Sequence, residues 1–209
     1  MNANDLSGVG AGFSDLARGS QAVFRAALEA LSHPGRIVDV PHDAQAPSRG
    51  HAASAALLLA LLDADCTLWL SPSLAASDAA AWLRFHTGCV LVGEPAEAQF
   101  AWVAHGDGLP ALQHFPQGTD NDPDRAATCV LDVPGLTDAA DAGAWTLRGP
   151  GIETTTRLRV DGLAPHLADS LLAQRAANHA AFPRGIDLLL AAPDRIVGLP
   201  RSTQVHLEG

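Results

Sequence analysis

Short runs of β-branched and apolar residues alternate with helical patterns along most of this 209-residue chain. Several of the runs are largely apolar, including CTLWL (66–70), TCVLDV (128–133) and IDLLL (186–190). Continuous apolar character is typical of strands covered on both faces, whereas the alternating run TTTRLRV (154–160) should expose one face. The pattern therefore favours an α/β fold with a mixed sheet and helices on both sides, a three-layer α/β/α arrangement. The remaining strand candidates are RIVDV (36–40), CVLVG (89–93), AQFAWVA (98–104), WTLRG (145–149) and RIVGL (195–199).

Helical patterns occupy the intervening segments. The first helix is predicted to begin at Ser14 or Asp15 and to end at SHPGR (32–36), with one face packed on a sheet. That face comprises Phe24, Ala27, Leu28 and Leu31. Residues 52–62 are apolar on every side, which predicts a helix that other elements largely cover.

Two further helices are predicted beyond residue 70. The third runs from Ser77, as its N-cap, to Phe85. The fourth begins near Pro165, because a proline loses no hydrogen bond in the first turn of a helix. Its apolar side comprises Leu167, Leu171 and Leu172.

The domain organisation follows from length and composition. A chain of this length with 47% apolar residues can bury roughly 70% of the surface that its unfolded form exposes. We therefore expect a single domain over residues 1–209, with residues 1–12 disordered. Residues 104–126 are rich in Gly, Pro and Asp and lack periodicity, which predicts a long exposed loop.

The charge of the chain excludes several classes of function. The formal net charge is −10, which repels polyphosphate backbones, so we expect neither nucleic acid nor an anionic membrane as a partner. All thirteen basic residues are arginines and the chain contains no lysine. A Schiff base to pyridoxal phosphate (PLP) and a phosphate-binding P-loop both require a lysine, so this chain can complete neither. We expect no cofactor.

The cysteines and histidines do not form a recognisable metal motif. Cys66, Cys89 and Cys129 lie far apart within apolar runs, which is typical of reduced, buried thiols in a cytosolic protein. His42, His105 and His114 lie in polar loops without the i, i+4 spacing that places two imidazoles on one metal. The N-terminus shows no secretory signal, and the longest apolar run, about eleven residues, is too short to span a bilayer. A cytoplasmic location is therefore expected.

Three arginines flank a predicted turn at residues 149–151. If the neighbouring runs form a hairpin, Arg157 and Arg159 project from the same face, Leu158 and Val160 point the other way, and Arg148 lies nearby. Such guanidinium groups are suited to bind phosphate or phosphonate oxygens bidentately. The alternative is a solvated sheet face on which the arginines pair with some of the 23 acidic residues.

The segment LRFHTG (83–88) ends the third predicted helix. Arg84 and His86 stand in its last turn before Gly88, where cations interact favourably with the helix dipole. His86 is the candidate catalytic residue, as a general acid, although the sequence identifies no carboxylate partner for it. Helix capping explains both residues without catalysis.

Two segments place an arginine directly after a proline. In FPRGIDLLL (182–190), Arg184 is held at the rim of the sheet and Asp187 stands at the entry of a buried strand. In GLPRST (198–203), Arg201 follows the strand RIVGL. An arginine at such a preset position suits an anion, a carboxylate such as Asp187, or the backbone of a partner protein. The sequence leaves these alternatives open.

In order along the chain, the segments VFRAALEALSHPGRI, LRFHTG, LRGPGI, FPRGIDLLL and GLPRSTQV resemble the PhnH family, a subunit of the bacterial carbon-phosphorus lyase system. The resemblance covers residues 23–205. It implies a fold similar to the large domain of PLP-dependent transferases, without the cofactor. It also implies homodimers of the isolated protein and a place among companion subunits that couple a phosphonate to the ribose of ATP with loss of adenine.

The resemblance transfers no catalytic residue to this sequence. Its first implication is a cytosolic, non-catalytic or accessory subunit supporting synthesis of ribose 1-methylphosphonate 5-triphosphate, in which Arg184, Asp187 and Arg201 structure a subunit contact or a cleft. One alternative is a self-sufficient phosphonate- or nucleotide-binding enzyme that uses the arginine cluster and His86. Another is an acidic small-molecule binding module without chemistry of its own.

Overall fold

A seven-stranded mixed sheet forms the centre of the protein in a computed structural model that describes residues 9–138, 143–163 and 165–207. Five neighbouring strands are parallel, whereas β10 runs antiparallel to β9 and β1 runs antiparallel to β10. The predicted α/β class with a mixed sheet is confirmed. In spatial order the strands are β1 (Val38–Asp39), β10 (Arg195–Leu199), β9 (Asp187–Ala191), β5 (Thr128–Asp132), β4 (Phe100–Val103), β2 (Thr67–Leu70) and β3 (Val90–Leu91).

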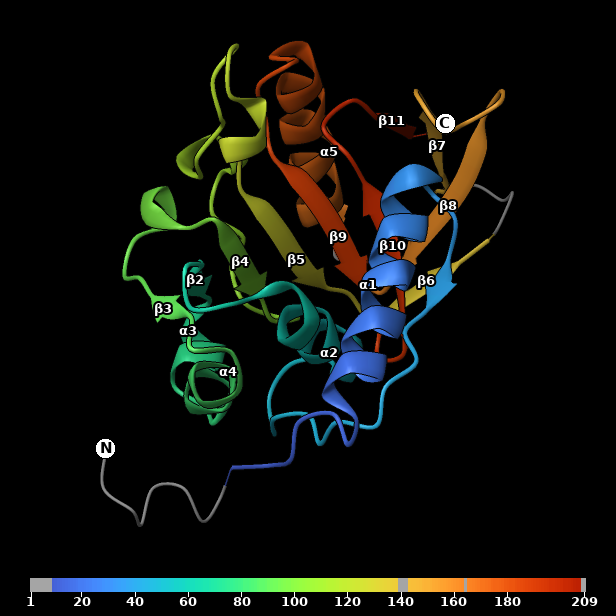
Figure 1. Cartoon of the computed structure of the whole chain (residues 1–209). Coiled ribbons are helices and arrows are strands. Elements are labelled where there is room, and N and C mark those ends of the chain that lie inside the picture. The colour runs from blue at the N-terminus through green and yellow to red at the C-terminus, as the bar shows by residue number, and fades with distance from the viewer. Residues whose placement is uncertain (1–8, 139–142, 164, 208–209) are drawn as a thin grey trace.

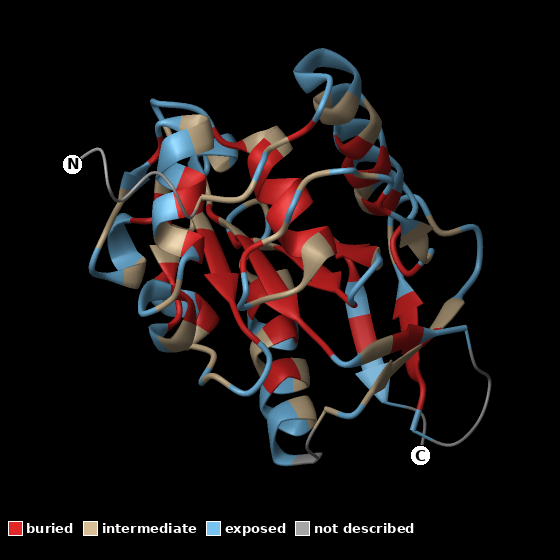
Figure 2. Ribbon diagram, turned by 90° about the horizontal axis from the view of Figure 1, so that it is seen from below, coloured by how far each residue is buried: buried red, intermediate tan, exposed pale blue. Residues whose placement is uncertain are grey.

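Helices cover one face of this sheet. They pack with Leu68, Trp102 and Ile196 of the strands into one buried cluster. Figure 2 shows the buried residues concentrated on the strands and on the inward sides of the helices. The helices of this layer are α1 (Leu16–Ser32), α2 (Ala52–Leu61), α3 (Pro72–Ala75) and α4 (Ala79–Thr87).

The opposite face is covered by a second sheet together with α5 (Pro165–Ala180). This sheet is antiparallel, and Trp145 and Leu158 pair within it and pack towards the strands of the large sheet. The prediction of helices on both faces is therefore wrong for much of the second face. In β8 and β11, Leu158 and Val205 are buried between more exposed neighbours, so these strands bury one face only. In spatial order they are β11 (Gln204–Leu207), β7 (Trp145–Arg148), β8 (Thr156–Asp161) and β6 (Gly135–Thr137), of which β6 and β11 were not predicted.

The face of α1 that packs on the sheet differs from the predicted one. Phe24 and Leu28 are 46% and 52% exposed, and the buried face comprises Val23, Ala26, Ala27 and Ala30. The reason lies in β10, where a Cβ at Gly198 would stand 2.4 Å from the carbonyl oxygen of Ala30. The helix backbone approaches the sheet so closely that only small side chains fit between them.

Other boundaries differ from the predictions by smaller amounts. The third predicted helix is α4, which begins after Asp78 and ends at Gly88 in the left-handed conformation. Ser77 precedes its N-cap residue, and the Ser77 hydroxyl accepts a hydrogen bond from the Ala79 N–H. The short α3 was not predicted. Of residues 1–12, predicted as disordered, residues 1–8 lie outside the described part.

The segment 104–126 is only partly the exposed loop that was predicted. Leu112 and Phe115 are 2% exposed and belong to the core beneath the second face. Short 3₁₀ turns interrupt the segment at Leu112–His114 and Pro123–Arg125. A further 3₁₀ turn, Pro95–Glu97, lies outside the segment and precedes β4. Figure 1 shows the later part of this segment, from Leu112 on, beside α5 at the end of the sheet where β9 begins.

In the described residues, no helix has the length and apolar character needed to cross a bilayer.

Candidate functional site

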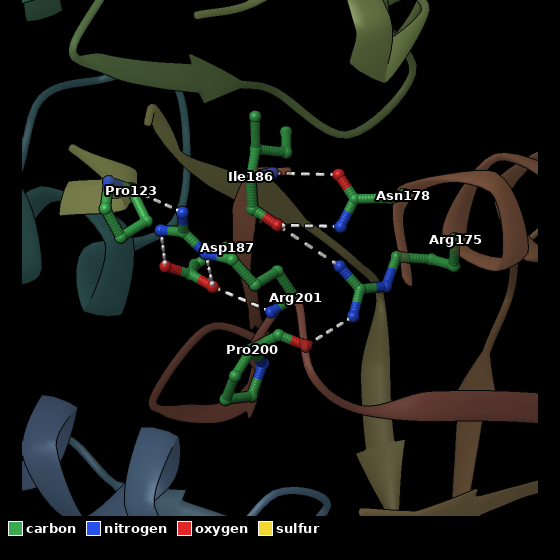
Figure 3. Close-up of polar contacts among 7 residues, drawn as sticks. All are labelled: Pro123, Arg175, Asn178, Ile186, Asp187, Pro200 and Arg201. Atoms are coloured by element: carbon green, nitrogen blue, oxygen red, sulfur yellow. Dashed lines mark hydrogen bonds and ion pairs between the residues drawn. The ribbon is translucent and has the colours of Figure 1, made fainter. Parts of the chain in front are cut away.

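Asp187 and Arg201 form a two-pronged ion pair at the rim of the large sheet (Figure 3). The Arg201 Nη2 lies 2.6 Å from Oδ2 of Asp187 and its Nε lies 3.2 Å from Oδ1. The backbone N–H of Arg201 also donates to Oδ1 at 2.7 Å. The sheet register explains the contact, because Leu188 pairs with Leu199 and so brings the flanking residues together. The side chains are only 23% and 14% exposed.

Both arginines of the Pro-Arg segments bind the segment 104–126. Arg201 Nη1 donates to the carbonyl oxygen of Pro123 at 2.5 Å. Arg184 Nε lies 3.3 Å from Oδ1 of Asp120, in a pair whose side chains are 54% and 76% exposed. The two segments thus fasten one loop to the rim of the sheet. Of the three partners that the sequence left open for Arg201, the structure shows the carboxylate of Asp187, together with a backbone carbonyl of the same chain.

A buried arginine that was not predicted stands beside this pair. Arg175 of α5 is 1% exposed, and its guanidinium donates to the carbonyl oxygens of Ile186 and Pro200 (Figure 3). It also donates to the carbonyl oxygen of Thr203. Burial lowers the pKa of Arg175 to about 10, and the negative charge of Asp187 opposes that shift. A guanidinium at this pKa remains charged at neutral pH, so it cross-links α5 to the ends of β9 and β10.

Asn178 completes the same junction. Its side chain accepts from the N–H of Ile186 and donates to the carbonyl oxygen of Ile186, at 2.8 and 3.0 Å. Leu171, Arg175 and Asn178 follow the i, i+4, i+7 spacing of one helix face. That spacing is the signal by which the sequence could have revealed two polar residues on the buried side of α5.

The hairpin that carries the other candidate arginines has the predicted geometry. In the register of β7 and β8, Thr146 pairs with Arg157 and Trp145 pairs with Leu158. Arg148, Arg157 and Arg159 therefore share the outer face of the second sheet, while Leu158 is fully buried on the inner face. Arg159 Nε lies 3.3 Å from Oδ1 of Asp161. An ion pair of this kind is what the solvated-face alternative requires.

His86 and Arg84 lie far from that hairpin. The His86 ring nitrogen Nε2 lies 2.9 Å from the carbonyl oxygen of Gly10, to which Trp82 Nε1 also donates. The ring makes edge contacts with Trp82 and Phe85 at centroid distances of 5.0 Å. Arg84 is exposed in the last turn of α4. Figure 1 places α4 and the β7–β8 hairpin on opposite sides of the molecule, so one reaction centre cannot use both.

We expect His86→Ala to lower the free energy of unfolding by about 1 kcal/mol, the usual contribution of one hydrogen bond. The lost contact is one of the two hydrogen bonds that hold Gly10 against α4, and the bond from Trp82 remains. Urea unfolding measures the change, and His114→Ala, at an exposed histidine, is the control. A general acid would instead show itself as a loss of about 10²–10⁴-fold in phosphonate turnover without a change in stability.

A second polar cluster, also not predicted, lies where β5 ends. Asp132 is 2% exposed and accepts hydrogen bonds from the Ser54 hydroxyl, from Trp102 Nε1 at 3.0 Å and from the His51 N–H at 3.0 Å. Burial raises the pKa of Asp132, although these bonds favour its ionised form. The imidazole of His51 in turn contacts the carbonyl oxygen of Ala191. The cluster joins the start of α2 to the centre of the sheet.

The cysteines and acidic residues provide no metal centre within the described residues, where no three ligand-type side chains come together. Cys66, Cys89 and Cys129 are free thiols, and the last two are buried. Complete burial raises the pKa of Cys129 to about 12, which makes it a poor nucleophile.

Comparison with known proteins gives two matches over most of the chain. A protein of Rhizobium meliloti (strain 1021), named alpha-D-ribose 1-methylphosphonate 5-triphosphate synthase subunit PhnH, is 37% identical over 94% of both chains. A putative C-P lyase subunit protein HtxG of Stutzerimonas stutzeri is 30% identical over 90% of this chain and 87% of its own. The model of the family described as bacterial phosphonate metabolism protein (PhnH) matches residues 11–206. This chain therefore belongs to the PhnH family.

Proposed function

We propose that the chain is a subunit of a carbon-phosphorus lyase complex and supports synthesis of alpha-D-ribose 1-methylphosphonate 5-triphosphate. The relatives are named as subunits of such systems, and they match almost the whole chain. In this proposal the protein acts in the cytoplasm by binding companion subunits, and it forms a homodimer when isolated. Its fold is a PLP-transferase-like domain over residues 1–209 that works without PLP.

The observation that carries this proposal is the exposed side of α1. Phe24 and Leu28, one helical turn apart, are 46% and 52% exposed on a helix whose other side is buried, and Leu16 in its first turn is 65% exposed. Large apolar side chains that lie next to each other on an exposed surface, as Phe24 and Leu28 do, are typical of a contact site. The rim residues Asp187 and Arg201, in contrast, are bound to each other, so in this proposal they shape the subunit and do not touch its partners.

The test is co-purification of companion subunits through an affinity tag on this chain. Phe24→Ser combined with Leu28→Ser should reduce recovery of the complex at least about tenfold, because the apolar contact is lost. The thermal midpoint should stay close to that of the unchanged protein, since both side chains are exposed. Leu207→Ser, at a residue 49% exposed on β11, is the matched control. Full recovery of the complex with the double variant would contradict the contact site.

A second candidate function has one supporting observation. The shared outer face of Arg148, Arg157 and Arg159 suits a phosphonate or nucleotide anion. Turnover by the isolated chain would support a self-sufficient enzyme, and saturable binding without turnover would support a binding module. The distance between this face and His86 argues against the enzyme that combines them.

A further inference from the structure

Two cysteines stand side by side at the edge of the large sheet. β3 is the outermost strand on that side and pairs in parallel with β2 (Figure 1). Thr67 of β2 pairs with Val90 of β3, and the Val90 N–H donates to the carbonyl oxygen of Cys66 at 2.9 Å. Cys66 and Cys89 immediately precede the two paired residues. Continued back by one position, the register therefore places the two cysteines beside each other.

Both cysteine side chains lie on the same face of the sheet. Successive side chains of a strand alternate between its two faces, so Cys66 shares a face with Leu68, and Cys89 shares a face with Leu91. All four pack with the helical layer, in the same buried cluster. Cys129, in contrast, belongs to the cluster on the opposite face. The third thiol is therefore separated from the other two by the sheet.

The backbone spacing suits a disulfide. Neighbouring strands of a sheet lie about 4.8 Å apart, and disulfides join residues whose Cα atoms are about 4.4–6.8 Å apart. The segments that lead into the two strands are also in contact, because a Cβ at Gly88 would stand 3.3 Å from the Cβ of Ala64. Cys66 and Cys89 thus meet the spacing requirement without a rearrangement of the sheet.

Small reagents can approach both thiols. Cys66 is only partly buried, and a cavity of about 440 Å³ is lined by Cys89 together with Arg84. Burial raises the pKa of both thiols. Asp63 adds to this shift at Cys66, whereas the positive charge of Arg84 favours the thiolate of Cys89. At neutral pH both groups are therefore mainly thiols, which react slowly with disulfides.

We propose that Cys66 and Cys89 are a redox-active pair that a small-molecule disulfide oxidises to an intramolecular disulfide. The thiolate of one cysteine attacks a sulfur of the small disulfide, and a mixed disulfide forms as one small thiolate leaves. The thiolate of the other cysteine then attacks the protein sulfur of the mixed disulfide, and the second small thiolate leaves. The protein gives up two electrons and two protons, and the small disulfide becomes two thiols. In cytosolic proteins, disulfides are usually transient ones of this kind.

The product bond would join β3 covalently to β2 at the open edge of the sheet. It would also close a loop that contains α3 and α4. The proposal goes beyond the proposed subunit function, because the reaction requires this chain alone.

The test equilibrates the purified full-length protein with mixtures of oxidised and reduced glutathione. Remaining thiols are then labelled under denaturing conditions, and mass spectrometry of the intact chain and of its peptides locates the bonds. Cys66 and Cys89 should lose their thiols together, in a monomer that is lighter by two hydrogen atoms, while Cys129 stays reduced. Three free thiols in the most oxidising mixture would overturn the proposal. So would a lasting glutathione adduct, a bond to Cys129, or a disulfide between two copies of the chain.

Single variants check the pairing. In Cys66→Ser and in Cys89→Ser, the remaining thiol of the pair can form only a mixed disulfide. At the mixture that oxidises half of the unchanged protein, this adduct should reach at most about a tenth of that level, because an adjacent thiol has a high effective concentration. Cys129→Ser is the matched control and should oxidise as the unchanged protein does. Equal oxidation of all three variants would refute the pair. Companion subunits are absent from these measurements, so failure here is distinguishable from failure of the proposed function.

Discussion

Gly198→Ala is expected to lower the free energy of unfolding by at least about 3 kcal/mol, the upper end of the range for overpacking. The added methyl group would stand 2.4 Å from the carbonyl oxygen and 2.6 Å from the carbonyl carbon of Ala30. These are backbone atoms in the last turns of α1, so no side-chain rotation can relieve the overlap. The helix must move away from β10 or the strand must bend.

The matched control is Gly93→Ala. No atom lies within 4 Å of a Cβ at Gly93, so the added methyl group meets open space. We expect a change of less than about 0.5 kcal/mol, as for a typical surface substitution. Urea unfolding of both variants gives the comparison. Equal stabilities would show that α1 packs on β10 less closely than the structure has it.

The same substitution also tests the exposed side of α1. If Gly198→Ala displaces the helix, Phe24 and Leu28 move with it, and recovery of the complex should fall together with stability. The serine variants at Phe24 and Leu28 should reduce recovery alone. Gly198→Ala therefore tests whether the position of Phe24 and Leu28 matters for assembly, and the serine variants test whether their apolar character matters.

Much of the architecture could be predicted from local patterns. The apolar runs predicted all seven strands of the large sheet, with β1 shortened to Val38–Asp39 and β3 to Val90–Leu91. The turn at residues 149–151 predicted the hairpin that aligns Arg157 and Arg159. These features depend on residues close together in the chain, so a single sequence contains the necessary information.

The face of α1 could not be chosen in this way. The helix carries two apolar stripes, one with Phe24 and Leu28 and one with Val23 and Ala27. Side-chain hydrophobicity favours the first stripe. Gly198, which lies far away in the sequence, decides which stripe faces the sheet. Because it has no side chain, α1 packs so close to β10 that only small side chains fit between them. Hydrophobic patterning contains no information on how closely two backbones approach.

The buried polar residues escaped prediction for a related reason. Asp132 receives its donors from Ser54, Trp102 and His51, which lie 30 to 81 positions away in the sequence. A buried carboxylate is tolerated only when such donors converge on it. A pattern of neighbouring residues cannot show that convergence, whereas the register of Asp187 and Arg201 follows once β9 and β10 are paired.

The ion pair of Asp187 and Arg201 should show strong coupling in a double-mutant cycle. We expect Arg201→Ala to lower the free energy of unfolding by about 3 kcal/mol, because it leaves a largely buried carboxylate without its partner. Asp187→Ala should have a similar cost. The double variant should cost about 1–3 kcal/mol less than the sum of the two, since neither charge is then left alone. Urea unfolding of the four proteins measures the cycle.

Arg184→Ala provides the control for that cycle. Its pair with Asp120 is more than half exposed on both sides, so its loss should cost at most about 1 kcal/mol. Additive effects at Asp187 and Arg201 would mean that the pair does not hold the rim together. If instead Arg201→Ala folds with full stability but loses companion subunits, the arginine belongs to an interface and not to the loop attachment. We expect the effects of the Asp187 and Arg201 substitutions on the free energy of unfolding to be coupled, and companion subunits to be recovered normally. The reason is that the Arg201 guanidinium already bridges Asp187 and the carbonyl of Pro123.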